Sequence, residues 1–269
     1  MKKIILISLC LYLIHPIKAL ASSENFELKE FNSCSFCSFK IGFKLQSLTD
    51  HRGVITEPNA QVMPGVAAYF FNDQLEVIPT SLSFFHYIDE PNIRFRYRLY
   101  QITDKPMVKL QSQDTSSYIH RENTIEAQFR IETFWGGNSD DYVAEFDLAY
   151  SKDIKTHWGD YFEILTKFKL ESFVLSEYNL VLEPNFFASL GWGNSSHNQY
   201  VYGPQAQQST FNNYAYGLWL AIPNRADRYY PIVMIKHFQT MNSDLKQADY
   251  ARGHDSGIAA SLIYSVKVL

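Results

Sequence analysis

The chain lacks several features that would place it in a common class of protein. Beyond its first 21 residues it has no run of about 18 apolar residues, which excludes a membrane-spanning helix. It has no P-loop, no glycine-rich dinucleotide fingerprint and no His-Glu-x-x-His metal motif. Charged residues make up only 19%, the net charge is -4, and no basic stripe carries interleaved aromatic residues. No nucleic-acid partner, cofactor or metal is therefore predicted.

Cysteine is also scarce, with only three in the chain. The Cys34-Ser-Phe-Cys37 segment has the spacing of a redox or metal half-site, but the chain has no second cysteine pair for zinc. An exported, oxidising setting favours a disulfide between Cys34 and Cys37, with free thiols as the alternative. In an extended strand their Cα atoms would lie roughly 10 Å apart, too far to bridge. A disulfide therefore requires the first strand to begin after Cys37.

The start of the chain has the pattern of a cleaved export signal. Lys2 and Lys3 form a basic start, residues 4–14 are almost wholly apolar, and Ala19-Leu20-Ala21 is a small-x-small cleavage site. The expected organisation is a signal peptide over 1–21, an N-terminal periplasmic segment over 22–38, and one outer-membrane β-barrel over 39–269.

The rest of the chain is dominated by alternating segments of about ten residues, and the segment at 93–99 is the clearest. Its apolar residues occupy alternate positions, and arginine fills the positions between them at Arg94, Arg96 and Arg98. Because successive side chains of a strand point to opposite faces, this segment has one apolar face and one cationic face. Strands of this length match a tilted membrane crossing. The pattern predicts an all-β fold, an antiparallel transmembrane β-barrel of about 12 strands in an outer membrane.

The spacing of the segments supports this count. Long gaps at 46–61, 112–123, 193–213 and 240–256 fall after odd-numbered strands, provided that the short segment 107–111 is itself a strand. That proviso favours twelve strands over ten or eleven. A soluble β-sandwich is the alternative fold, but strand length, the export signal and aromatic residues at strand ends favour the barrel. The expected strands are 39–45, 62–71, 76–86, 92–101, 107–111, 125–132, 142–150, 162–171, 178–192, 214–222, 230–238 and 258–268.

Charged residues on the polar faces of these strands are expected to line the lumen. They form either a polar pore or anion path, or a salt-bridge network that fills a narrow barrel, and the second interpretation is favoured. Serine, histidine and aspartate occur together in the predicted loops at 195–198 and 254–256. Neighbours in sequence rarely point at one another, so no catalytic residue is assigned and a lipid-modifying barrel enzyme is the lesser alternative. The predicted lumen-facing residues are Arg94, Arg96, Arg98, Glu126, Arg130, Glu145 and Asp147.

Two segments resemble parts of a known family. Residues 62–70, followed by Leu75-Glu76-Val77, are similar to the proline-containing early hairpin of the MipA/OmpV family of outer-membrane proteins. The Tyr200-Val201-Tyr202-Gly203 segment is similar to the Tyr-x-Gly segment that opens a long loop in that family. The resemblance implies a non-enzymatic barrel surrounded by outer-membrane lipid. It also implies a scaffold for murein hydrolase and synthase proteins, or a surface antigen, and it transfers no catalytic residue.

Overall fold

The computed structural model describes residues 36–71, 74–88, 92–102, 122–137, 142–175, 180–222 and 231–267, all within the compact unit Phe36–Leu269. The expected signal peptide and Cys34 lie outside these residues. The first strand begins at Phe36, three residues before the expected position, and it includes Cys37. A disulfide between Cys34 and Cys37 was expected to require a first strand that begins after Cys37, and β1 begins before it. Because Cys34 lies outside the described residues, this disulfide stays a prediction.

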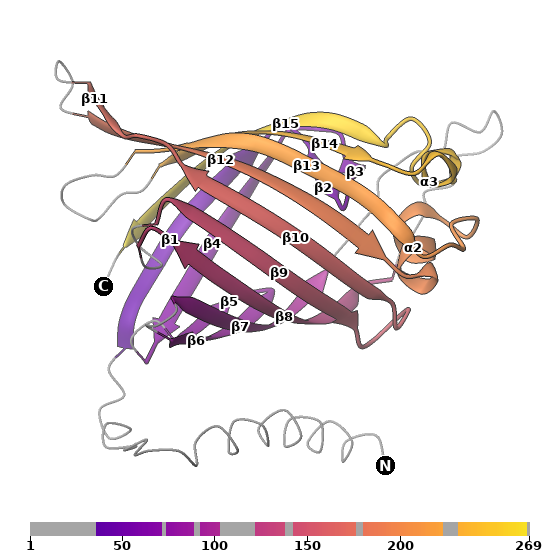
Figure 1. The fold of residues 1–269 in the computed structure, drawn as a ribbon, viewed down its shortest axis with the longest axis horizontal. Coiled ribbons are helices and arrows are strands. Elements are labelled where there is room, and N and C mark those ends of the chain that lie inside the picture. The colour runs from indigo at the N-terminus through magenta and orange to yellow at the C-terminus, as the bar shows by residue number, and fades with distance from the viewer. Residues whose placement is uncertain are drawn as a thin grey trace, which may run out of the picture. The chain divides into compact units, whose positions relative to one another are not determined.

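The described residues form a closed antiparallel β-barrel (Figure 1). Thirteen strands make one sheet, and the pairing of β10 with β12 closes the sheet into a ring. Strand β11 (Phe173–Leu175) pairs with the first residues of β12, so twelve strands form the ring. In chain order the ring strands are β1 (Phe36–Gln46), β4 (Gln61–Phe70), β5 (Leu75–Ile78), β6 (Ser81–Ile88), β7 (Ile93–Ile102), β8 (Thr124–Trp135), β9 (Ala144–Asp153), β10 (Asp160–Lys169), β12 (Leu180–Gly193), β13 (Thr210–Ala221), β14 (Ile232–Thr240) and β15 (Ser256–Lys267).

Two of the expected strands need correction, although the total of twelve is confirmed. The expected strand over 76–86 is two strands, β5 and β6, joined by a two-residue turn at Pro79-Thr80. Proline cannot donate a ladder hydrogen bond, so Pro79 ends the first strand, and the exposed apolar residues change from Val77 before the turn to Leu82 and Phe84 after it. The expected strand over 107–111 lies outside the described residues, and β7 pairs directly with β8. Because 76–86 contributes two strands, β5 and β6, the ring reaches twelve strands without a strand at 107–111.

The two faces of the barrel wall differ sharply in polarity. On β9, Phe146 and Leu148 are 48% and 51% exposed, whereas Glu145 and Asp147 are 2% and 3% exposed. The barrel thus places apolar residues outside and carboxylates inside, the reverse of a soluble sandwich, which buries its apolar face. The same arrangement recurs around the ring, where the exposed apolar residues include Ile41, Phe43, Leu82, Phe84, Tyr97, Leu99, Ile164, Leu218 and Ile235.

One end of the barrel is covered by folded loops. The loop after β1 forms a hairpin of β2 (Thr49–His51) and β3 (Val54–Glu57), and the loops after β12 and β14 each contain a helix. These are α2 (Ser195–Tyr202) and α3 (Ser243–Gln247), which lie together at one end of the barrel (Figure 1). The strand order confirms that the expected loops 46–61, 193–213 and 240–256 share one end, whereas 112–121 lie outside the described residues.

The folded loops have a small core of their own. Val54 of the hairpin, Val201 and Tyr202 of α2, and Leu245 of α3 are fully buried against one another. The backbone N–H of Tyr250 donates to the Tyr202 carbonyl at 2.9 Å. We call this assembly of β2, β3, α2 and α3 the loop cap. No helix in the described part of the chain is long and apolar enough to cross a membrane.

Candidate functional site in the barrel interior

The inner faces of β7 to β10 form a wall of paired charges, which we call the charged wall. Glu132 on β8 accepts from the Nε of Arg94 and from Nη2 of Arg96, the latter at 3.1 Å. Arg98, the third arginine of β7, donates instead to the Ser81 hydroxyl at 2.7 Å. Strand alternation places all three arginines on one face, and the pairing of β7 with β8 brings Glu132 opposite Arg94.

The charged wall continues across β8, β9 and β10. Arg130 donates to Asp147 and to Glu163, each at 2.9 Å, and so links three strands. Lys167 pairs with Glu145 and lies 3.6 Å from Asp147. With Glu126 described below, the seven predicted lumen-facing residues all lie on the inner faces of β7, β8 and β9. A network in which Arg94, Arg96, Arg130 and Lys167 each meet a carboxylate holds these strands together and fills this side of the lumen.

A further arginine, Arg52 at the tip of the β2–β3 hairpin, points into the lumen. Arg52 donates through both Nη atoms to Glu126, at 2.7 and 2.5 Å, and through Nη2 to the Tyr100 hydroxyl at 3.2 Å. Its guanidinium lies 3.9 Å from the ring centroid of Tyr161 and 3.1 Å from the ring nitrogens of His197. We call this group the Arg52 latch, because it joins the hairpin to β7, β8, β10 and α2.

The backbone at the tip explains how an arginine comes to point into the barrel. Arg52 has φ 51° and Gly53 has φ 88°, so both central residues of the turn are left-handed. Two such residues match the twist of a tight hairpin, and glycine is the usual second residue. An arginine in this region is uncommon, and it is held there by the bonds that its side chain makes. A second anchor, the ion pair of Asp50 with Lys236 on β14, fixes the other side of the tip.

Electrostatics keep the Arg52 guanidinium charged despite its burial. Burial lowers the pKa of Arg52, but attraction to Glu126 and Tyr100 and the hydrogen bond to Glu126 outweigh it, and the net shift is upward. His157, in the loop after β9, behaves differently. Burial lowers the pKa of His157, and the nearby carboxylate of Asp153 only partly opposes this shift. The permanent cation of the latch therefore lowers the pKa of His157 further, which favours the neutral imidazole.

In the part of the chain that the structure describes, two groups of side chains bring enough donor atoms together for a metal ion. The first is Glu126, His157 and His197, and the second is Glu132, Glu145 and Asp147, with donor atoms within 4.8 Å in each group. In both groups the carboxylates are already bound to protein cations, because Arg52 holds Glu126, Arg94 and Arg96 hold Glu132, and Lys167 holds Glu145. A metal ion would have to displace these groups, so the donor sets do not fit a resident metal.

The predicted loop segments with serine and histidine do not meet as a catalytic group. Residues 195–198 open α2, and His197 turns inward onto the Arg52 latch. His254 to Ser256 lie at the start of β15, where the carbonyl of His254 accepts from the N–H of Ile55 at 2.8 Å. His197 therefore contacts Arg52 of the hairpin, and His254 binds the hairpin through its backbone carbonyl.

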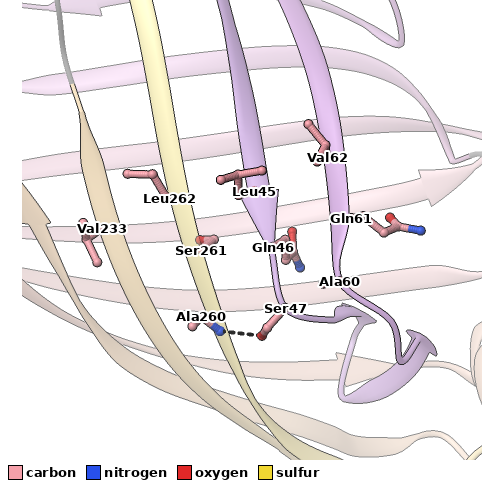
Figure 2. A pocket seen from close by; sticks show the side chains of 10 residues that line it. All are labelled: Leu45, Gln46, Ser47, Ala60, Gln61, Val62, Val233, Ala260, Ser261 and Leu262. Atoms are coloured by element: carbon pink, nitrogen blue, oxygen red, sulfur yellow. Dashed lines mark hydrogen bonds between the residues drawn. The ribbon is translucent and has the colours of Figure 1, made fainter.

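Among the hollows formed by the described residues, one lies on the outer face of the barrel wall and another on the inner face. A crevice of about 460 Å³ on the outer face is shown in Figure 2, where Leu45, Val62, Val233 and Leu262 lie along β1, β4, β14 and β15. At its loop-cap end the N–H of Ala260 donates to the Ser47 hydroxyl at 2.9 Å. Since β1 and β15 are hydrogen-bonded along 40–46, the crevice is a surface groove and no passage through the wall. The second hollow, of about 390 Å³, lies inside the barrel below the hairpin tip.

Several residues of the interior were not predicted from the sequence. Asp50 and Arg52 lie in an expected loop, and Lys167, Trp219 and Lys236 were not assigned to the lumen. The alternating segment 49–57 with Arg52-Gly53 at its centre is a hairpin signal that would have indicated the first two. Neither a protein-family model nor a curated protein matches the sequence. The MipA/OmpV resemblance therefore stays a prediction.

Proposed function

We propose that this protein is an outer-membrane β-barrel with a closed lumen, which acts as a non-enzymatic interaction protein through its ends. The observation that carries the proposal is the inverted polarity of the wall, with exposed Phe146 and Leu148 beside buried Glu145 and Asp147. An apolar outer face is stable in hydrocarbon and costly in water. Closure of the ring leaves no unpaired strand edge, which is the other requirement for crossing a bilayer.

A closed lumen is favoured over a small channel by two features of the interior. The charged wall occupies the side formed by β7 to β10, and the hairpin crosses from β1 to Glu126 on β8. Val54 then packs beneath α2 and α3, which covers the hairpin from outside. Purified protein in planar bilayers should therefore show no stepwise conductance. Regular single-channel steps from the unmodified protein would favour the channel instead.

The interaction surface is proposed to be the loop cap. Long loops on a rigid scaffold carry most recognition functions, and tyrosine offers a large contact area with few rotatable bonds. In this barrel the loop cap is folded, with α2 capped by Asn194, whose side chain accepts from the His197 N–H at 3.0 Å. The resemblance to MipA/OmpV adds a second partner class, the murein hydrolase and synthase proteins, which would meet the opposite end and residues 22–37.

Paired deletions test this assignment. Removal of 197–210 takes away most of α2 and, from the ring strands, only Thr210 at the start of β13, so the barrel should still assemble. Envelope proteins captured by the intact chain should be lost either with this deletion or with removal of 22–37. A partner set that survives both deletions would contradict a function at the barrel's two ends. A deletion of the exposed strand β11 by shortening 171–179 serves as the control, because it also changes a loop.

A further inference from the structure

The barrel interior has a second wall that differs from the charged wall. The inner faces of β12, β13 and β14 carry small, amide and aromatic side chains, with Lys236 as the one cation among those that line the cavity there. The cavity of about 390 Å³ extends along this wall from Arg52 at the hairpin tip to Trp219 and Met234. Trp219 and Met234 lie two residues from the ends of their strands at the side away from the loop cap. We call this wall the open wall.

An aromatic surface forms part of the open wall. The rings of Phe187 and Trp219 are stacked, with centroids 5.7 Å apart and planes at 27°. Gly217 makes this stacking feasible, because a Cβ at that position would lie 2.8 Å from the Phe187 ring. The sheet thus omits a side chain where the two rings approach. A flat aromatic surface beside a cavity is suited to a ligand with an apolar face.

Neutral polar groups lie next to the rings. The Asn213 side-chain oxygen accepts from the Tyr161 hydroxyl at 3.2 Å, which directs the amide NH2 elsewhere. Among the described residues neither this NH2 group nor the Ser189 hydroxyl has a hydrogen-bond partner, and both residues line the cavity. Polar groups of this kind at a cavity wall are available to bind a ligand's hydroxyl groups.

The charged side chains that line the cavity are already matched by opposite charges. Lys236 pairs with Asp50 and Arg52 pairs with Glu126. Glu163 is held by Arg130, and Lys167 pairs with Glu145. An ionic ligand would have to break one of these pairs, whereas a neutral ligand can bind to their remaining donors and acceptors. The wall therefore favours a ligand that is polar, uncharged and apolar on one face.

We propose that the cavity is a binding site for a neutral saccharide, reached from the end opposite the loop cap. A sugar ring has the required chemistry, because its C–H face stacks on an aromatic ring while its hydroxyl groups donate and accept hydrogen bonds at the edge. The Arg52 latch closes the other end, so the site is a blind pocket and no path across the barrel. The inference rests on the proposed barrel, and it adds a ligand class that the proposed interaction function does not require.

Trp219 supplies a direct readout. The chain has four tryptophans, at 135, 158, 192 and 219. Replacing Trp135, Trp158 and Trp192 by phenylalanine leaves Trp219 as the single tryptophan in the full-length protein, purified in detergent and excited where tyrosine does not absorb. Maltose, cellobiose and diacetylchitobiose are the probes, and succinate and glycine betaine are the charged comparisons. At least one saccharide should give a saturable change in Trp219 fluorescence, and the charged compounds should give none.

Matched substitutions on β12 locate the effect. Ser189→Phe fills the cavity and should weaken saccharide binding at least tenfold. Ala188→Phe, on the outer face of the same strand, should leave it unchanged. Calorimetry on Trp219→Leu gives a second measurement if Ser189→Phe does not assemble, and it too should show at least a tenfold loss. No saturable response to any of the three saccharides, tighter binding of succinate, or equal losses at positions 188 and 189 would overturn the proposal.

This experiment is independent of the test of the proposed function. It uses assembled barrel in detergent, and it does not depend on a membrane fraction or on a protein partner. Saccharide binding with no partner at either end would refute the interaction function alone. Partner binding without a saccharide response would refute the pocket alone.

Discussion

The charged wall and the open wall are neighbouring parts of one barrel, joined where β10 pairs with β12, and they hold the barrel in different ways. On the charged wall, the single side chain of Arg130 on β8 forms ion pairs with Asp147 on β9 and with Glu163 on β10. On the open wall the strands are held mainly by their backbone ladders, and the inner side chains include those of Ser189, Asn213 and Ala215. The difference indicates that stability is concentrated on one side of the lumen and free volume on the other.

The largest expected effect comes from removing a carboxylate of the charged wall. Glu132→Leu leaves Arg94 and Arg96 without their shared acid, in a site where Glu132 is 1% exposed. Loss of one partner from a buried ion pair costs about 3–5 kcal/mol, and the lower end applies because the arginines are a quarter exposed. Urea unfolding in lipid vesicles measures the change. Ser189→Ala on the open wall is the control and should stay within about 0.5 kcal/mol. Equal effects would remove the contrast between the walls.

Reversing the polarity of the outer face should have the next largest effect. Phe129 lies on the outer face of β8, between Gln128 and Arg130 of the inner face. An arginine near the middle of a bilayer costs about 2–4 kcal/mol, so Phe129→Arg should reduce assembly strongly. Arg96→Gln on the inner face should be tolerated, because Arg94 still pairs with Glu132. Assembly is measured by the heat-dependent shift on a denaturing gel, and the opposite ranking would contradict the assignment of faces.

The Arg52 latch should control the hairpin more than the barrel. Arg52→Ala removes charged hydrogen bonds that are worth about 1.5–3 kcal/mol each, and it leaves Glu126 with the Tyr100 hydroxyl. Amide hydrogen exchange over 49–57 should therefore accelerate while exchange in the ring strands changes little. Arg52→Lys keeps the charge without the planar fork and should give an intermediate result. Unchanged exchange in 49–57 would show that the loop cap alone holds the hairpin.

The smallest expected effect is on the pH dependence of stability, through His157 in the loop after β9. The folded state lowers the pKa of His157 through burial, so between this lowered value and about 6.5 the unfolded chain binds the proton more readily. The contribution of His157 to stability is therefore present above about pH 6.5 and is lost as the pH falls below it. His157→Gln should flatten this part of the stability profile, as measured by thermal unfolding from pH 7.5 to 5. A stability that rises on acidification would contradict the direction of the shift.

The sequence predicted the barrel because alternation is a local property. Arg94, Arg96 and Arg98 show the period of a strand without reference to any other part of the chain, and their separation from Phe95 and Tyr97 indicates an apolar outer face. The split of 76–86 was missed because the segment was interpreted as one continuous strand. The outward apolar residues change from an odd position at Val77 to even positions at Leu82 and Phe84, and Pro79 lies at that change.

The contents of the lumen were only partly predictable for a physical reason. Glu126 could be placed on an inner face, but its partner Arg52 comes from a loop 74 positions earlier, and no local pattern reports such a pair. The open wall was missed because Trp219 and Phe187 are apolar residues on an inner face, where the rule of a polar lumen expects none. Departures from a local rule of this kind are expected at sites with a function.

The location of the mature protein tests the central claim most directly, because an apolar outer face is stable only in a bilayer. Cells that produce the full-length chain are fractionated, and the envelope is separated into inner and outer membranes before gel analysis with and without heating. The account predicts recovery in the outer-membrane fraction, with faster migration of the unheated sample. Recovery as a soluble periplasmic protein, with migration unaffected by heat, would contradict it.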